Sequence, residues 1–242
     1  MTELVFPAAP HTTVAVAQRA AVFPVRRIYC VGRNYVAHAR EMGADTREPP
    51  FFFQKPADAI VASGSTIAWP SVTRNLHHEV ELVLAIGRPG FGIAAQDARR
   101  HVFGVAVGID LTRRDLQEAA KKSRQPWESG KSFDASAPIG AIHPLEDAEP
   151  LPRTGRITLS VNGVVRQDGD LAEMIWGCDE IVAQLSFFFQ LAATTEIYTG
   201  TPAGVGLVEA GQRVDADIDG IVVLSNPFVR HSAVGHHDRA DL

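Results

Sequence analysis

The chain has 242 residues, of which 45% are hydrophobic and 21% charged, and its formal net charge is −5. That composition is typical of a globular domain, and without an excess of basic residues it argues against binding to nucleic acid or an anionic membrane. Two distant cysteines, Cys30 and Cys178, predict no disulfide. With no signal peptide and no apolar run of about 18 residues, we expect a cytoplasmic protein without membrane spans.

The chain divides into three parts by composition. Residues 1–24 are rich in Ala, Val and Pro and predict an N-terminal arm with one short strand. Residues 25–230 are expected to form a single domain, because β-rich folds of this size commonly fold as one unit. Residues 231–242 are polar and predict a frayed tail. The expected fold class is α+β, rich in strands, with a few flanking helices.

The first predicted strand, RIYCVG at 27–32, is followed by a short helix for which Asn34 is a candidate cap. His38 and Glu41 lie three positions apart on that helix and therefore share a face. Such a pair is most often a surface ion pair or hydrogen bond. Because a helix this short does not persist alone, residues 35–50 predict a mobile cover that orders only when packed.

The next stretch predicts short strands. The sequence FFFQK at 51–55 is typical of a strand, in which Lys55 is interpreted as structural. Residues 60–69, IVASGSTIAW, contain a Ser-Gly-Ser turn and predict a hairpin between the flanking strands.

Three carboxylates then fall in two apolar runs, HEVELVLAI and GVAVGID. Side chains alternate across a strand, so Glu79 and Glu81 share a face, and Asp110 ends the second run. Carboxylates side by side on a covered strand are costly unless a cation lies between them. Three carboxylates without a thiolate suit Mg²⁺, Mn²⁺ or Ca²⁺. On its own, E-x-E is more often a solvated face, and His77 on the same face leaves zinc as an alternative.

After Asp110 the sequence RRDLQEAAKK predicts a helix. Thr112 and Asp115 have capping-box-like spacing, and Arg114 and Gln117 share a helix face. A helix start beside a bound cation could hold an anionic group, although adjacent arginines are more often solvated surface.

The remaining sequence is mainly β. Residues 156–169 alternate around Asn162-Gly163, a strong hairpin signal. Residues 178–191 predict a helix, and EIYTGTPAGVG at 196–206 predicts a strand with a glycine-rich turn.

Several segments together resemble the fumarylacetoacetate hydrolase family: LHHEVEL, GIDLTRRDLQ, GKSFDASAP and YTGTPAGVG. The resemblance runs from about residue 23 to about 228 with the motifs in the family's order. It is closest to the single-domain branch of acylpyruvate and fumarylpyruvate hydrolases, and FPVRRIYCVGRNYVAHAREMG and REPPFFFQKPADA favour the fumarylpyruvate members. One departure is Thr195-Glu196, where the family usually has Gly-Asp.

The resemblance implies a mixed β-sandwich roll, a homodimer and metal-dependent hydrolysis of a carbon–carbon bond in a 2,4-dioxo acid, fumarylpyruvate being favoured. It assigns one divalent cation, Mg²⁺ or Mn²⁺ with Ca²⁺ as an option, to Glu79, Glu81 and Asp110. The residues it implies for catalysis are His38, Glu41 and Lys131, and for substrate contact Arg114, Gln117 and Thr201. Lys131 alone in a Gly-Ser loop would be unremarkable.

A distal carboxylate needs a cationic partner, for which Arg33 is our candidate. Three alternatives remain at this point. The first is acylpyruvate hydrolysis or oxaloacetate decarboxylation by the same site. The second is a zinc hydrolase using His77 or His78, and the third is a non-catalytic, metal-dependent binding module.

Overall fold

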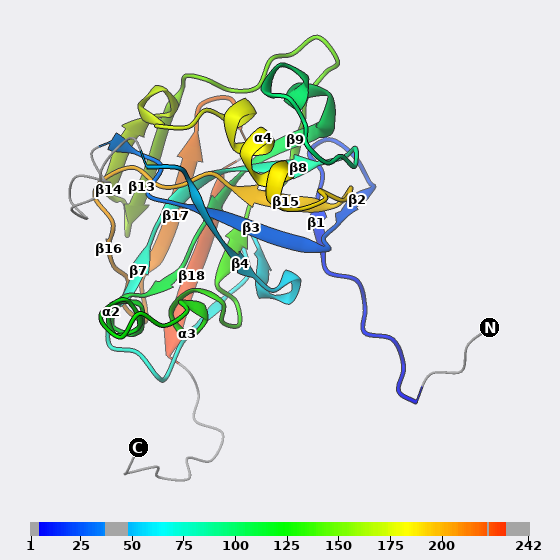
Figure 1. Ribbon diagram of the computed structural model, residues 1–242. Helices are drawn as coiled ribbons and strands as arrows, with labels where there is room; N and C mark the ends of the chain where they lie inside the picture. Colours follow the sequence, from blue (N-terminus) through cyan, green and yellow to red (C-terminus); the bar gives the residue numbers. More distant parts are fainter. Residues whose placement is uncertain (1–4, 37–47, 222, 231–242) are drawn as a thin grey trace.

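The strands β8 (Val80–Ile86) and β9 (Val102–Ile109) form the centre of the largest sheet in the computed structural model (Figure 1), which describes residues 5–36, 48–221 and 223–230. Every residue of β8 is buried. The strand is rich in Val, Leu and Ile, which pack well on a sheet covered on both faces. β9 pairs with β8 antiparallel, so Val80 lies opposite Ile109 and the carboxylate-bearing ends of the two segments come together.

The largest sheet has the strand order β4-β3-β15-β8-β9-β11-β5, and β12 pairs with β9 beside it. The other strands of this sheet are β3 (Arg27–Gly32), β4 (Phe51–Lys55), β5 (Ile60–Ala62), β11 (Ala137–Ile139), β12 (His143–Pro144) and β15 (Thr195–Tyr198). The predicted strands at 27–32 and 51–55 are confirmed, and they pair with each other antiparallel.

A second sheet has the order β14-β13-β17-β18-β6. Its strands are β6 (Ile67–Trp69), β13 (Arg156–Val161), β14 (Val164–Asp170), β17 (Arg213–Ile218) and β18 (Leu224–Arg230). The predicted hairpin is confirmed, because β13 and β14 are joined at Asn162 and Gly163, whose φ angles of 50° and 78° are those a two-residue hairpin turn requires.

The hairpin predicted around the Ser-Gly-Ser turn is wrong. The turn itself is present, since Ser65 N donates to Ala62 O. The flanking strands β5 and β6 belong to different sheets, however, because β5 pairs in parallel with β11 and β6 in parallel with β18. The turn therefore carries the chain from one sheet to the other.

The smaller elements complete the fold. Two short sheets have the orders β1-β2 and β10-β7-β16. Their strands are β1 (Thr13–Ala15), β2 (Val22–Pro24), β7 (Leu76–His78), β10 (Thr112–Arg113) and β16 (Gly206–Leu207). Among residues 5–36, 48–221 and 223–230, the helices are α2 (Arg114–Lys122), α3 (Glu128–Lys131) and α4 (Cys178–Phe188), with 3-10 turns η1 (Ala57–Ala59), η2 (Ala95–His101) and η3 (Leu171–Glu173).

The hydrophobic core has two parts, one on each face of the largest sheet. Leu82 and Leu84 of β8 contribute to the larger part, together with the inner face of the second sheet and helix α4. Val83 and Ala85 of the same strand face the smaller part, which β1 and β2 help to cover. The N-terminal arm thus contains two strands where one was expected. Figure 1 shows α4 at one end of the molecule and α2 with α3 at the other.

Two expectations about the whole chain can be compared with the structure. Both cysteines are free and buried, as expected. Within the described ranges, no helix combines the length and the apolar character that a bilayer crossing needs.

Candidate active site and metal centre

Glu79, Glu81 and Asp110 form a buried group of carboxylates where β8 begins and β9 ends. Their exposed fractions are 4%, 2% and 1%, and one oxygen from each lies within 4.8 Å of the other two. Asp110 N donates to Glu79 O at 2.8 Å, which holds the two segments in register. The structure thus brings together the three carboxylates that the sequence had placed on two separate strands.

The carboxylate group fits a divalent cation. With metal–oxygen distances of about 2.1 Å for Mg²⁺ and up to about 2.6 Å for Ca²⁺, oxygens that all lie within 4.8 Å of one another are close enough to share one ion. All three donors are oxygens, as hard cations prefer. Asp110 Oδ1 is a buried atom that accepts no hydrogen bond from the described residues, although Lys55 Nζ lies 2.8 Å away as an ion pair. The Lys55 contact occupies one side of this oxygen, and its second lone pair could bind a metal.

Lys131, Lys55 and Arg114 are buried cations that pair with these carboxylates. Lys131 Nζ donates to Glu79 Oε2 at 2.7 Å and to Asp110 Oδ2 at 2.6 Å. Lys55 Nζ pairs with Asp110 and also donates to the backbone oxygens of Leu111 and Lys131. Lys55 was interpreted as structural, and these contacts place its charge directly on a candidate metal ligand.

The electrostatics of the site follow from burial. Burial, together with the neighbouring Asp110 and Glu79 charges, raises the pKa of Glu81 well above its usual value. Burial alone would lower the pKa of Lys131, but the adjacent Asp110 and Glu79 carboxylates raise it, so its ammonium stays charged. Without a bound cation, burial and the neighbouring carboxylates therefore favour the protonated form of Glu81, while Lys131 balances the charges of Glu79 and Asp110.

Arg114 organises one side of the carboxylate group. Its Nη2 atom donates to Glu79 Oε1 and its Nη1 atom to Gln117 Oε1 at 2.6 Å. The predicted shared face of Arg114 and Gln117 is therefore confirmed. Because Arg114 donates to Gln117 Oε1, the NH₂ group of Gln117 is turned away from the guanidinium. The predicted capping box is wrong, since the hydroxyl of Thr112 donates to Asp110 O and the carboxylate of Asp115 accepts from Thr73.

His77 does not join the carboxylates as a metal ligand. Its Nδ1 atom accepts from Arg114 Nε at 3.3 Å, and its Nε2 atom lies 2.8 Å from Asn75 Oδ1. Burial and the Arg114 charge lower the pKa of His77 to about 4, which fits a neutral ring accepting from the guanidinium. The one group of potential ligands within the described ranges contains no histidine, so the zinc alternative loses its support.

Glu81 is held from the opposite side by a backbone amide that Asn34 orients. Gly200 N donates to Glu81 Oε2 at 2.7 Å, and Asn34 Nδ2 donates to Thr199 O at 2.8 Å. The accepting oxygen of Thr199 and the donating N–H of Gly200 belong to the same peptide group. The hydrogen bond from Asn34 therefore fixes the orientation of the amide that binds Glu81. Gly200 has a φ of 100°, and a Cβ there would lie 2.6 Å from Asn34 Cβ. Asn34 was expected only as a helix cap.

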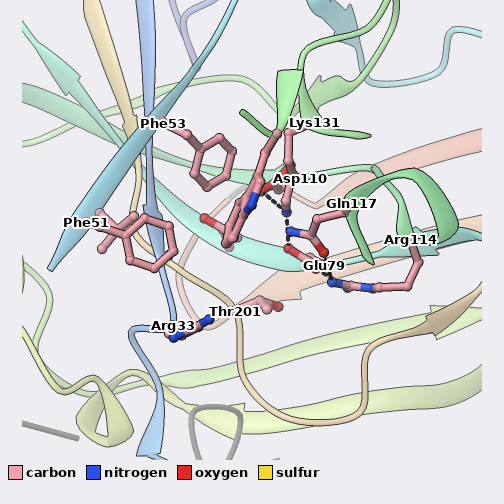
Figure 2. A pocket seen from close by; sticks show the side chains of 13 residues that line it. Arg33, Phe51, Phe53, Glu79, Asp110, Arg114, Gln117, Lys131 and Thr201 are labelled. Carbon is pink, nitrogen blue, oxygen red and sulfur yellow. Dashed lines mark hydrogen bonds and ion pairs between the residues drawn. The ribbon is translucent and has the colours of Figure 1, made fainter. Parts of the chain in front are cut away.

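The pocket beside the carboxylates has an aromatic wall and a basic rim (Figure 2). Phe51 and Phe53 lie on one side, and both pack against Trp127. Arg33 lies over the Phe51 ring at 5.6 Å, and its Nε atom is buried without a hydrogen-bond partner among the described residues. Lys121 lies 5.9 Å from the centre of the Trp127 ring, and burial followed by the Arg33 charge lowers its pKa.

The remaining predicted site residues divide by location. Thr201 lines the pocket with Lys131 and Gln117, and Figure 2 shows it beside Arg33. His38 and Glu41 lie in 37–47, outside the described residues, so their role stays a prediction. Lys55 went unrecognised because its partners are distant in sequence; a lysine within an apolar strand is the signal that could have revealed it.

Comparison with known proteins identifies the family. The family model for the fumarylacetoacetate (FAA) hydrolase C-terminal region matches residues 27–229. The oxaloacetate tautomerase FAHD1 of Rattus norvegicus mitochondria is 41% identical over 197 residues, covering 81% of this chain and 89% of the relative. The fumarylpyruvate hydrolase of Ralstonia sp is 40% identical over 178 residues, covering 74% of this chain and 92% of the relative.

A solved structure agrees with these relatives. The crystal structure of fumarylpyruvate hydrolase from Pseudomonas aeruginosa, in complex with Mn²⁺ and pyruvate, has a TM-score of 0.91 and 48% identity to this chain. The match covers 95% of this chain and all of the other. The β-rich fold and the divalent cation predicted from the sequence are therefore confirmed at the level of the family. The chain belongs to the fumarylacetoacetate hydrolase family.

Proposed function

We propose that this protein is a divalent-metal-dependent hydrolase that cleaves fumarylpyruvate into fumarate and pyruvate. The observation that carries the proposal is the buried Glu79–Glu81–Asp110 group, which opens into a pocket with a basic rim. A 2-oxo acid end suits a bound cation, and a second carboxylate suits cations at the rim. The fumarylpyruvate hydrolases among the similar proteins support the choice of substrate.

Glu79, Glu81 and Asp110 would hold the cation, which when bound supplies Lewis acidity for the 2-oxo carboxylate end of the substrate. Gln117 directs its NH₂ group away from Arg114 and can donate to the acid. Arg114 keeps both Gln117 and Glu79 in place. Their shared role is to position the substrate, which converts binding energy into correct orientation.

Lys131 and the aromatic wall would serve the reacting end. The charged ammonium of Lys131 lies at the carboxylate group, where it can stabilise a developing oxyanion. Phe51, Phe53 and Trp127 provide an apolar wall that excludes water and strengthens such charge interactions. Arg33, whose buried Nε atom has no hydrogen-bond partner among the described residues, would receive the distal carboxylate, and Lys121 would add positive charge nearby.

The proposed reaction adds one water across one carbon–carbon bond. His38, paired with Glu41, would take a proton from water, so that hydroxide attacks the C4 carbonyl of the dioxo acid. The bond between C3 and C4 breaks, its electron pair passes to the pyruvate enolate, and the enolate takes up a proton at C3. The proton that His38 took from water can return to C3, and the new carboxyl group loses its own proton, so the products are fumarate, pyruvate and one H⁺.

Oxaloacetate tautomerase activity is the second candidate. The observation that favours it is the 41% identity to a mitochondrial oxaloacetate tautomerase. Tautomerisation needs the same chelated 2-oxo acid and an enol, but no water attack and no long distal pocket. Arg33 and the aromatic wall beyond the carboxylates favour the longer substrate. Oxaloacetate tautomerisation, rather than oxaloacetate decarboxylation, is therefore the main alternative to hydrolysis.

A panel of substrates separates the two candidates. Loss of ultraviolet absorbance would be followed for fumarylpyruvate, acetylpyruvate and enol-oxaloacetate, each with Mn²⁺ or Mg²⁺ and with excess chelator. The proposal expects the highest kcat/KM for fumarylpyruvate and no turnover with chelator. A higher kcat/KM for enol-oxaloacetate, with fumarylpyruvate left intact, would instead assign the protein as a tautomerase.

A further inference from the structure

Gln167 is a fully buried glutamine on β14 that no step described so far uses. Its Oε1 atom lies 3.1 Å from Val80 N and 2.9 Å from His78 Nδ1. Its Nε2 atom lies 2.8 Å from Thr201 Oγ1 and 3.0 Å from Pro202 O. The side chain therefore joins the strands that carry the candidate metal ligands to the loop that carries Thr201.

The directions of these hydrogen bonds are fixed by their backbone partners. Val80 N–H can only donate, so the atom that it contacts is the amide oxygen of Gln167. Pro202 O can only accept, so the atom that it contacts is the amide nitrogen. The two hydrogens of that nitrogen point to Pro202 O and Thr201 Oγ1. Thr201 Oγ1 is consequently an acceptor toward Gln167, and its own hydrogen remains to be donated elsewhere.

The hydroxyl of Thr201 lies at the pocket. Thr201 is 3% exposed and lines the pocket with Glu81, Asp110 and Lys131. A threonine hydroxyl can in general either donate or accept, so it does not by itself discriminate between ligand atoms. Because the Thr201 oxygen already accepts a hydrogen bond from Gln167, its hydroxyl hydrogen points toward the ligand. A ligand oxygen of a carboxylate or oxo group can accept this hydrogen bond, whereas a ligand group that must donate cannot.

We propose that Gln167 is a positioning residue that fixes Thr201 as a hydrogen-bond donor and thereby favours the binding of 2-oxo acid oxygens. The inference rests on the proposed function, because it assumes that the pocket binds a 2-oxo acid beside the cation. It adds a selectivity device to that site, made from a glutamine that does not itself line the pocket.

The test is a double-mutant cycle on binding rather than turnover. Oxalate, a 2-oxo acid mimic, would be titrated calorimetrically into the Mn²⁺-saturated wild type, Gln167→Glu, Thr201→Val and the double variant. The introduced carboxyl still accepts from Val80 N and His78. Ionised, it cannot donate, and the hydroxyl of Thr201 would turn to donate to it; protonated, it has a single hydrogen for Pro202 O and Thr201, where glutamine has two. We expect Gln167→Glu to weaken oxalate by about tenfold or more, the cost of a lost hydrogen bond to a charged group.

The decisive quantity is how much the effect of Gln167→Glu on oxalate affinity changes when the Thr201 hydroxyl is absent. In the Thr201→Val background, the factor by which Gln167→Glu lowers the affinity for oxalate should be at least several-fold smaller than in the wild type. Thr201→Ser keeps the hydroxyl and should preserve the full effect. Equal effects of Gln167→Glu in both backgrounds would overturn the proposal, because they would mark a general effect of charge or packing.

Two further measurements separate the ways in which the proposal can fail. If Gln167→Glu does not fold, Gln167→Met replaces it in the cycle, because methionine introduces no charge. Equal effects of Gln167→Met on oxalate affinity with and without the Thr201 hydroxyl would also overturn the proposal. The Mn²⁺ affinity and kcat of Gln167→Met should stay close to those of the wild type while KM for the dioxo acid rises. Absence of Mn²⁺-dependent oxalate binding to the wild type would contradict the proposed function itself, and this inference with it.

Discussion

Replacing Glu196 by glutamine should stabilise the protein at neutral pH and change its stability little at acidic pH. Glu196 lies in the middle of the largest sheet, fully buried, and neither carboxylate oxygen has a hydrogen-bond partner among the described residues. Its neighbours across the sheet are Ile28 and Ala85, both in the smaller part of the core. Burial raises the pKa of Glu196 to about 8, so the native protein holds this side chain protonated at pH 7.

The magnitude follows from the difference in pKa between the two states. The pKa of Glu196 is 4.5 in the unfolded chain and about 8 in the folded protein, so the unfolded state ionises first as the pH rises. The contribution of Glu196 to stability is therefore most favourable below pH 4.5 and is lost as the pH rises from 4.5 to 8. At about 1.4 kcal/mol per pH unit, the cost is about 1 kcal/mol at pH 5 and about 3 kcal/mol at pH 7. Glutamine cannot ionise and escapes this cost.

Urea denaturation at pH 5, 6, 7 and 8 would measure the difference in the free energy of unfolding between Glu196→Gln and the wild type. Excess chelator in every sample removes the pH dependence of metal binding. The advantage of the variant should grow by about 2 kcal/mol between pH 5 and pH 7. The exposed Glu209 provides a matched control, since Glu209→Gln should show no such growth. A constant difference across this range would refute the reasoning, because it would show that Glu196 is ionised in the native protein.

The other predictions concern the site. Glu81→Gln should weaken Mn²⁺ binding in calorimetry by more than about 100-fold, beyond the effect typical of outer-shell changes, and wild-type affinity would exclude Glu81 as a ligand. Asn34→Ala should lower the affinity for Mn²⁺ about 10- to 100-fold, because the Gly200 amide that binds Glu81 would lose its fixed orientation. Asn226→Ala, which also removes a buried asparagine that donates to two backbone carbonyls, should leave Mn²⁺ affinity unchanged; equal losses in both would mean a general structural effect. Arg33→Ala should lower the kcat/KM ratio of fumarylpyruvate to acetylpyruvate about 10- to 100-fold, and an unchanged ratio would remove Arg33 from the distal site. His38→Ala should lower kcat by about 10²- to 10⁴-fold without affecting Mn²⁺ affinity, and retention of most of the activity would point to another base.

Features determined by neighbouring residues could be predicted from the sequence. The Asn162-Gly163 hairpin depends on a two-residue turn whose backbone angles those residue types favour, and the structure shows that turn. The shared face of Arg114 and Gln117 follows from helical spacing alone. Alternation along one predicted strand placed Glu79 and Glu81 together, and the structure brings them together, although Glu79 lies in the break between β7 and β8.

Features determined by distant partners could not be predicted in this way. The turn at residues 63–65 looked like a hairpin, but β5 and β6 find their partners in β11 and β18, far along the chain. The ion pair of Lys55 with Asp110 was not predicted, because the two residues are 55 positions apart in sequence. Thr112 was expected to cap a helix, but it pairs with His77 in a short strand instead. Tertiary contacts override local preference in each case.

The stoichiometry of the products tests the central claim most directly. Fumarylpyruvate would be incubated with the Mn²⁺-loaded protein, and fumarate and pyruvate would be quantified over time by proton NMR. The account predicts one fumarate and one pyruvate for each substrate consumed, with no reaction after chelation and none with Asp110→Asn. Release of both products at an unchanged rate in chelator or in Asp110→Asn would contradict a metal centre at these carboxylates, and consumption of substrate without pyruvate would contradict carbon–carbon bond hydrolysis.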